Sequence, residues 1–438
     1  MKTLILLLTL LIPLLTISQN IGENADKVLT SYTLQHTFSG NVLIAKKGKI
    51  VFEKAYGYAD KDKNQLNDLQ TEFRAGSLTK MFTSTLILQL LEAGKVKLTD
   101  RINAYLPQFE NGDKITIKNL LSHTSGIRGT TKPNDITLYQ MVNGFKQEPL
   151  AFKPGERFEY NNFNYILLGY IAEKITGKAY SILIKNMIFD KAGMNHSGFD
   201  YEERKSGDRA LGYVVNTETK NLEKSKSGNV AAAASAGALY TTIGDLFKWS
   251  NAINNHTLLS AKSYEQAFLP VIGNYGLGWM IDKKNGRFKI GHTGSIEGFM
   301  ADFIKFPKED VTIIFLSNLQ DMIDYHISNV LTAIAFNEPY TEQKTKVEIT
   351  LPESTLKKYI GSYESNGDRM VVSFKDRQLF VLAPGGDTAE LTPEAEGKFF
   401  IKGPEISIEF RRESGKDVMF VDVHGGQSFI KVAEHLLK

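Results

Sequence analysis

Ser77-Leu-Thr-Lys80 runs directly into the apolar segment Met81-Phe-Thr-Ser-Thr-Leu-Ile-Leu-Gln-Leu-Leu91. Because this segment is apolar nearly all round and is followed by Gly94, it predicts a buried helix with a glycine at its C-terminal end. Positions i and i+3 of a helix share a face, so the Lys80 amine can reach the Ser77 hydroxyl and take its proton. The same spacing recurs at Ser354–Lys357 and Ser428–Lys431. Other residues must therefore decide whether the pair carries chemistry.

The composition describes an ordinary folded protein. The chain has 438 residues, of which 42% are hydrophobic and 23% charged, and a net charge of +3. This length suits about two to three domains, and the charge gives no argument for a nucleic-acid partner. Because cysteine is absent, thiolate nucleophiles and thiolate metal ligands are excluded. The eight histidines include no HExxH pair, so we expect no metal site. We expect no organic cofactor either.

The first 18 residues have the pattern of a secretory signal peptide. Lys2 precedes the apolar run Leu4–Ile17, and small residues around Ser18 suit cleavage before Gln19. The alternative is a membrane anchor, but the run is shorter than the ~20 residues that span a bilayer, and Pro13 interrupts it. We therefore expect a protein without a stable membrane span, exported to the periplasm or the extracellular space.

Residues 19–336 predict one α+β domain. An N-terminal helix, 24–38, precedes a hairpin turning at Lys47-Gly-Lys49. A mainly helical region follows over 116–249. Consecutive strands then follow, and a closing helix is expected over 321–336. The expected strands of the domain are 41–45, 50–56, 276–281, 288–292, 298–306 and 311–316, and helices are expected at 164–175, 180–189 and 242–253. The early hairpin and the late strands can share one antiparallel sheet with helices packed on it.

The remaining chain predicts a second, smaller domain. Residues 337–349 are polar and read as a linker. Short strands at close spacing follow within 350–438, which is typical of a small all-β barrel or sandwich. The segments expected as strands are 370–374, 378–382, 398–401, 406–410, 418–421 and the stretch around Ser428.

Two further clusters bear on the Ser77 question. Tyr160-Asn-Asn162 follows the turn at Pro154-Gly155 and precedes a predicted helix, so a phenol and an amide can approach the serine and lysine. Alone, this cluster reads more simply as a helix-capping asparagine beside a core tyrosine. His292-Thr-Gly-Ser295 ends a predicted strand, and Gly294 permits a close backbone approach. Alone, it reads as a strand end with a hydrogen-bonded histidine.

The order of these three clusters resembles the serine β-lactamase and penicillin-binding protein family. The similarity is to the class C-like branch, with its D-alanyl-D-alanine carboxypeptidases, D-aminopeptidases and esterases. It covers about residues 25–335, and the motifs that carry it are Phe73–Lys80, Leu120-Leu-Ser-His-Thr-Ser-Gly126, Tyr160–Gly169, Ala236-Gly237 with Thr241–Trp249, and His292–Ser295. The resemblance implies a β-lactamase-like antiparallel sheet flanked by helices. Leu356-Lys-Lys-Tyr359-Ile-Gly361-Ser-Tyr363 likewise resembles the opening of the lipocalin-like barrels attached to such hydrolases.

The resemblance also implies roles for the motif residues. Ser77 would be the acylated nucleophile, and Lys80 and Tyr160 would handle its proton, with the division between them open. The backbone N–H groups of Ser77 and Ser295 would form the oxyanion hole. His123 and Ser125 are interpreted as structural.

The remaining site residues would hold the substrate. Asn162 would bind Lys80 and a substrate carbonyl, and His292 and Thr293 would line the cleft beside Gly294. Many β-lactamases carry lysine where this chain has His292, and a largely neutral imidazole holds a carboxylate less firmly than an ammonium does. That difference weakens the case for efficient β-lactam hydrolysis.

The sequence thus predicts a serine hydrolase that forms a covalent acyl-enzyme. Its substrate would be a small D-amino-acid-containing peptide, for which peptidoglycan is one source, or a small ester. The alternative is a sensor or binding module that acylates slowly or not at all. A pure binder needs no proton-handling groups, so Ser77, Lys80 and Tyr160 together favour the enzyme. The oligomeric state and the role of the C-terminal domain stay open.

Overall fold

The computed structural model falls into two compact units, one within residues 20–341 and one within residues 348–432. It describes residues 20–130, 137–200, 209–216, 222–226, 230–320, 323–341, 348–365, 368–384, 386, 388–401, 406–422 and 427–432. The expected signal peptide lies outside this set, as do residues 342–347 of the expected linker. Across the described residues, no helix is both long and apolar enough to cross a bilayer.

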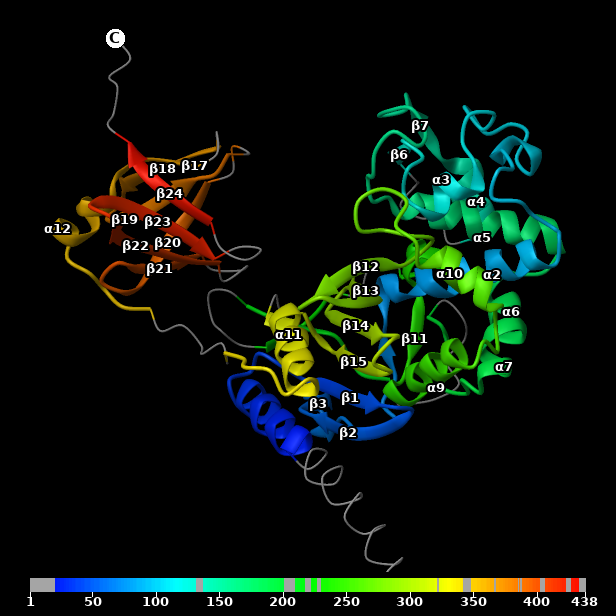
Figure 1. Ribbon diagram of the computed structural model, residues 1–438, viewed down its shortest axis with the longest axis horizontal. Coiled ribbons are helices and arrows are strands. Elements are labelled where there is room, and N and C mark those ends of the chain that lie inside the picture. Colours follow the sequence, from blue (N-terminus) through cyan, green and yellow to red (C-terminus); the bar gives the residue numbers. More distant parts are fainter. Residues whose placement is uncertain are drawn as a thin grey trace, which may run out of the picture. The chain divides into compact units, whose positions relative to one another are not determined.

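A six-stranded antiparallel sheet forms the centre of the first unit (Figure 1). Its order is β12 (Met280–Lys284), β13 (Arg287–Ile296), β14 (Phe299–Phe306), β15 (Val311–Ser317), β1 (Gly40–Lys46) and β2 (Lys49–Tyr56). β1 pairs with β15 over seven residues, so the early hairpin and the late strands share one sheet, as predicted. The hairpin turns at Lys47-Gly48, where both residues have positive φ, as a type I′ turn requires.

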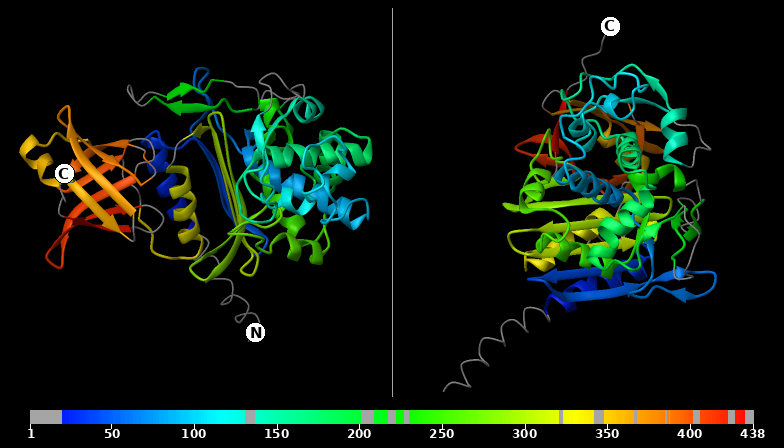
Figure 2. Two further views of the ribbon diagram at one scale, coloured as in Figure 1. Left: turned by 90° about the horizontal axis from the view of Figure 1, so that it is seen from above. Right: turned by 90° about the vertical axis from the view of Figure 1, so that its right-hand side faces the viewer.

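Helices cover both faces of this sheet (Figure 2, left). A helix over residues 20–34 and α11 (Ile323–Ala335) pack on one face, around an apolar cluster that includes Val42, Phe315 and Leu331. The other face carries a larger cluster that joins α2 (Thr79–Glu92), α5 (Asn162–Thr176) and α9 (Ile243–Asn254). The arrangement is the predicted α+β architecture.

Short elements fill the connections of this unit. They are β3 (Tyr58–Asp60), β4 (Gln65–Leu66), β5 (Phe73–Arg74), η1 (Gly76–Leu78), η2 (Ile102–Ala104), α3 (Ile117–Leu121), β6 (Arg128–Thr130), α4 (Leu138–Gly144), β7 (Lys146–Glu148), α6 (Tyr180–Ile184), η3 (Lys185–Phe189), α7 (Asp190–Ala192), β8 (Gly198–Phe199), β9 (Tyr213–Val215), β10 (Leu222–Lys224), η4 (Val230–Ala233), α8 (Ala234–Gly237), β11 (Leu239–Thr241), α10 (Ala261–Ala267) and β16 (Leu319–Gln320). Of these, η1, α3 and α8 are next to the candidate site.

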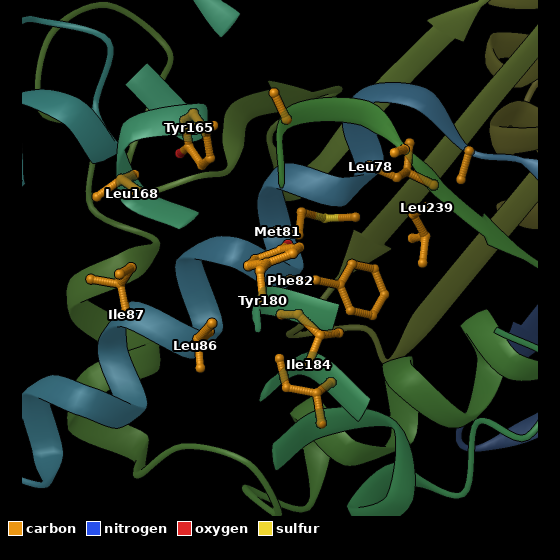
Figure 3. Close-up of a cluster of buried hydrophobic side chains, with 14 of the residues drawn as sticks. Leu78, Met81, Phe82, Leu86, Ile87, Tyr165, Leu168, Tyr180, Ile184 and Leu239 are labelled. Carbon is orange, nitrogen blue, oxygen red and sulfur yellow. The ribbon is translucent and has the colours of Figure 1, made fainter. Parts of the chain in front are cut away.

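The helix predicted after Ser77 is α2, and it is buried over nearly its whole length. Met81, Phe82 and Leu86 pack among Tyr180, Ile184 and Leu239 (Figure 3). Ala93 ends the helix, and Gly94 follows with φ +69°, a left-handed conformation that glycine adopts without steric cost. A helix surrounded by apolar side chains gives Ser77 and Lys80 a rigid base.

Three predicted elements differ from the structure. The N-terminal helix covers residues 20–34 rather than 24–38, and His36 beyond it has positive φ. The helix expected over 180–189 continues from α6 into a π-helical turn, η3. The strand expected over 276–281 begins only at Met280, because Gly278 has φ +84° and a side chain there would meet Ser84 of α2.

The second unit is a closed antiparallel barrel of eight strands (Figure 1). It opens with α12 (Glu353–Leu356) and η5 (Lys357–Tyr359). The strands are β17 (Gly361–Ser365), β18 (Asp368–Lys375), β19 (Gln378–Leu382), β20 (Thr388–Ala395), β21 (Lys398–Ile401), β22 (Ile406–Glu413), β23 (Lys416–Asp422) and β24 (Gln427–Val432). Pairing of β17 with β24 closes the barrel, and Leu379, Met419 and Phe429 lie in its own apolar cluster.

Candidate active site

Ser77 lies in the 3₁₀ turn η1, directly before α2. The Lys80 Nζ atom, one helical turn further on, is 2.8 Å from the Ser77 Oγ atom. It also donates a hydrogen bond to the Ala236 carbonyl oxygen of α8, at 2.8 Å. The predicted serine–lysine contact is therefore present, and the backbone of α8 fixes the position of the amine.

Lys80 is fully buried, and burial sets its ionisation. Its side chain has 0% exposure, and removal from water lowers its pKa well below the usual lysine value. Within the described part of the chain, Lys80 forms no ion pair with a carboxylate that would oppose this shift. The site thus favours a neutral amine, which can accept a proton.

Tyr160 meets the same serine from the start of α5. Its hydroxyl donates to the Ser77 Oγ atom at 2.9 Å, and its ring centroid is 4.9 Å from the Lys80 Nζ atom. Tyr160 is 40% exposed, and Ser77 itself is half-buried. The three residues that the resemblance named as catalytic therefore converge within hydrogen-bonding distance.

The edge of β13 lies beside η1. β12 pairs with β13 only as far as Gly291, which leaves residues 292–296 unpaired on that edge. A Cβ atom added to Gly294 would lie 2.1 Å from the Ala75 carbonyl oxygen, and one added to Gly76 would lie 2.9 Å from the Ser295 nitrogen. Glycine at both positions therefore lets the Ser77 and Ser295 backbones approach each other, as an oxyanion hole needs.

An ion network braces this contact between the two segments. Arg74 on β5 pairs with Asp200 at 2.7 Å and with Glu297, two residues beyond Ser295, at 3.4 Å. Arg209 pairs with Asp200 and with Glu72, and these side chains are largely buried. On the other side, the Gln320 side-chain amide donates to the Ser295 Oγ atom at 3.1 Å. These contacts fix the chain close to Ser77 and Ser295, whose N–H groups would form the oxyanion hole.

His292 differs from expectation, because its side chain is buried rather than open to the cleft. Its Nε2 atom is 3.0 Å from the Tyr275 hydroxyl and its Nδ1 atom is 2.6 Å from the Thr293 carbonyl oxygen. Burial, with a smaller contribution from nearby Lys80, lowers its pKa to about 3. His292 is therefore neutral at physiological pH. Thr293 is half-buried and Ser295 is exposed, so these two residues are the more accessible part of the motif.

Asn162 also differs from expectation. It occupies the first turn of α5, is exposed, and makes no hydrogen bond with Lys80, whose amine bonds Ser77 and Ala236 instead. The helix cap is the neighbouring Asn161, whose side chain accepts from the Phe163 N–H at 2.8 Å. Asn161 therefore has the helix-capping role that this cluster also suggested.

Sequence reasoning missed Tyr275 and gave His123 only a structural role. Tyr275 bonds His292 and stands 5.5 Å, centroid to centroid, from Phe158. No spacing pattern linked it to the motifs. His123 lies in the Leu120–Gly126 run that supported the resemblance, and its ring centroid is 4.3 Å from that of Tyr160.

Comparison with known proteins identifies the family of the chain. The model of the family described as Beta-lactamase matches residues 26–333, well over half of the chain. The chain belongs to the beta-lactamase family. Among curated members, Penicillin-binding protein 4* of Bacillus subtilis (strain 168) is 30% identical over 427 residues, covering 90% of this chain and 94% of that protein. PbpX of the same strain is 35% identical over 299 residues, covering 68% and 74%.

Solved structures of beta-lactamase relatives share the fold. A penicillin-binding protein from Bacillus halodurans is 26% identical with a TM-score of 0.62, covering 70% of this chain and 98% of that one. An octameric penicillin-binding protein homologue from Pyrococcus abyssi has a TM-score of 0.67 at 24% identity, covering 93% and 99%. A D-amino acid amidase from Ochrobactrum anthropi SV3 has a TM-score of 0.63 at 20% identity, covering 72% and 98%.

Proposed function

We propose that this protein is an exported serine hydrolase that acts through a covalent acyl-enzyme on D-amino-acid-containing peptides or small esters. The observation that carries the proposal is the convergence of Lys80 and Tyr160 on the Ser77 hydroxyl, at 2.8 and 2.9 Å. Membership of the beta-lactamase family supports the reaction class.

The protonation states follow from the contacts. When Lys80 is neutral, its amine donates to the Ala236 carbonyl and its lone pair can accept the Ser77 O–H, while the Tyr160 hydroxyl donates to the Ser77 oxygen. Ser77 then attacks the substrate carbonyl carbon as its proton moves to Lys80. The leaving amine or alcohol takes a proton from Lys80 or Tyr160 as the bond between it and the carbonyl carbon breaks. Water later hydrolyses the ester on Ser77 and regenerates the enzyme.

The proposed substrate class rests on the neutral state of His292. His292 cannot supply a cation for a substrate carboxylate, because its pKa is about 3 and Tyr275 and Thr293 occupy its ring nitrogens. Substrates that need such a cation, penicillins and cephalosporins among them, should be poor. Neutral esters and amides should be better. The amidase among the structural neighbours supports including D-amino acid amides in this class.

The proposal is tested by comparing catalytic efficiencies on a nitrophenyl ester, a D-alanyl dipeptide, a D-amino acid amide and a chromogenic cephalosporin. We expect turnover of an ester, dipeptide or amide, and abolition of it in Ser77→Ala with the fold retained. Ser354→Ala, which removes a serine of the same spacing in the barrel unit, is the matched control. A wide preference for the cephalosporin would restore β-lactamase as the primary function.

Mass spectrometry of the protein after exposure to penicillin or a fluorophosphonate addresses the alternative. A stoichiometric adduct on Ser77 with no turnover of any of the four substrates would identify a slowly acylating sensor instead of an enzyme. The same spectra give the mature N-terminus from a native host, and cleavage before Gln19 is the expected result.

A further inference from the structure

His123 holds the segment that carries Tyr160. It follows α3, is fully buried and has φ +55°. Its carbonyl oxygen accepts from the Glu159 N–H at 2.9 Å, and its Nδ1 atom accepts from the Asn161 N–H at 3.1 Å. One histidine thus binds the backbone on both sides of Tyr160. Its ring lies against the Tyr160 ring, with centroids 4.3 Å apart and planes inclined by 34°.

The neighbouring side chains define which nitrogen of His123 accepts. The Ser125 hydroxyl donates to the Asn164 Oδ1 atom at 2.7 Å, which turns the Asn164 amide so that its Nδ2 group faces the His123 Nδ1 atom at 3.2 Å. Nδ1 therefore faces two N–H donors and must be unprotonated. Burial lowers the pKa of His123 well below its usual value, which keeps the ring neutral. Within the described residues, Nε2 makes no hydrogen bond.

Tyr160 needs such a support. Its side chain is 40% exposed and it precedes the first turn of α5, so burial alone does not fix the ring over Ser77. A displacement of about 1 Å in a reacting group can cost on the order of a hundredfold in rate. A buried acceptor fixes the adjacent peptide, and the tilted His123 ring packs against the phenol.

We propose that His123 is a positioning residue, which holds the Tyr160 hydroxyl on the Ser77 Oγ atom chiefly through its Nδ1 acceptor. This inference rests on the proposed function, because it assigns His123 to the acylation of Ser77. It also explains why the residue is a histidine: phenylalanine would keep the ring but leave the Asn161 N–H without its acceptor.

The test separates the acceptor from the ring. In His123→Asn, the Oδ1 atom replaces Nδ1, and asparagine tolerates positive φ better than most residues. In His123→Phe the ring stays and the acceptor is lost. We measure the maximal rate and the apparent affinity for labelling of Ser77 by a fluorophosphonate, with the folded fraction from circular dichroism. We expect a maximal rate at least about tenfold lower in the phenylalanine variant, within about threefold of wild type in the asparagine variant, and little change in affinity in either.

A double-mutant cycle with Tyr160→Phe distinguishes positioning from a general folding defect. If His123 acts through the tyrosine hydroxyl, adding His123→Phe to the Tyr160→Phe variant should lower the labelling rate by less than about threefold. Full additivity, or a phenylalanine variant that labels at the wild-type rate, would overturn the inference. The inference would also be overturned if His123→Asn labelled as slowly as His123→Phe, because restoring the acceptor would then have no effect.

A second readout does not depend on turnover. With 3-fluorotyrosine at position 160, the wild type and His123→Asn should each give one narrow ¹⁹F resonance, and His123→Phe should give a broadened or multiple signal. A wild type that no probe labels at Ser77 would defeat the proposed function alone. An ordered Tyr160 in His123→Phe would defeat this inference alone.

Discussion

At the scale of the residue, the ionisation of Lys80 should govern how the reaction depends on pH. Burial lowers the pKa of Lys80, and only the neutral amine can accept the Ser77 proton. The acylation rate should therefore rise with pH through a pKa well below that of a free lysine, then level off. Lys80→Arg, which stays charged, should lose on the order of a hundredfold or more at every pH. The measurement is the pH profile of Ser77 labelling under single-turnover conditions.

The chain offers a matched control for that profile. Lys305 on β14 is also buried beside a serine hydroxyl, with its Nζ atom 2.9 Å from the Ser250 Oγ atom, and burial lowers its pKa to about 8. Lys305→Met should change thermal stability and leave the profile of labelling in place. A pH profile that changes in Lys305→Met but not in Lys80→Arg would contradict the assignment of Lys80 as the base.

Residue types and their order were readable from the sequence, but side-chain directions were not. The order of Ser77, Lys80 and Tyr160 led to three side chains that the structure brings together. Asn161 and Asn162 are adjacent and chemically alike, so only the start of α5 decides which one caps the helix. The burial of His292 depends on Tyr275, which approaches from a loop before β12 and leaves no local pattern.

At the scale of the element, the contact between β13 and η1 should control the oxyanion hole. A methyl group at position 294 would sit 2.1 Å from the Ala75 carbonyl oxygen, so Gly294→Ala must push β13 away from Ser77. We expect the labelling rate of the folded protein to fall by about a hundredfold, because the Ser295 N–H moves by about 1 Å. The measurement is again the single-turnover rate, corrected for the folded fraction.

Gly244 provides the control for this substitution. It lies in the first turn of α9, where an added Cβ atom would find only Thr242 at 3.8 Å. Gly244→Ala should keep the wild-type labelling rate. An active Gly294→Ala protein would show that the strand tolerates displacement, and that the Ser295 N–H is not a required donor.

Elements with strong local patterns were predictable, whereas those shaped by distant contacts were not. The hairpin of β1 and β2 follows from β-branched runs around Lys47-Gly48. By contrast, residues 276–279 form loop rather than strand. Gly278 has φ +84°, and a Cβ atom on Gly276 would lie 2.3 Å from the Ala267 carbonyl oxygen. β20 was missed because it contains Pro393, which lies at an irregularity in the pairing with β21.

At the scale of the whole molecule, each compact unit has apolar clusters of its own. Leu86 lies at 0% exposure in the cluster around α2, and Leu379 lies at 0% exposure in the barrel cluster. The proposed catalytic side chains, those of Ser77, Lys80 and Tyr160, all belong to the first unit. If the two cores are energetically independent, a cavity in one should leave the stability of the other unchanged.

Leu379→Ala and Leu86→Ala form a matched pair that tests this independence. Each removes the same atoms from a fully buried position and should lower the free energy of unfolding of its own unit by about 2–5 kcal/mol. Calorimetry should show two unfolding transitions. Leu379→Ala should lower the transition temperature of the barrel unit only, and Leu86→Ala that of the first unit only. In that case the labelling rate of Ser77 should survive Leu379→Ala below both transitions. A labelling rate that falls with the barrel's stability would mean that the barrel supports the active site, and the barrel would then have to be counted as part of the catalytic machinery.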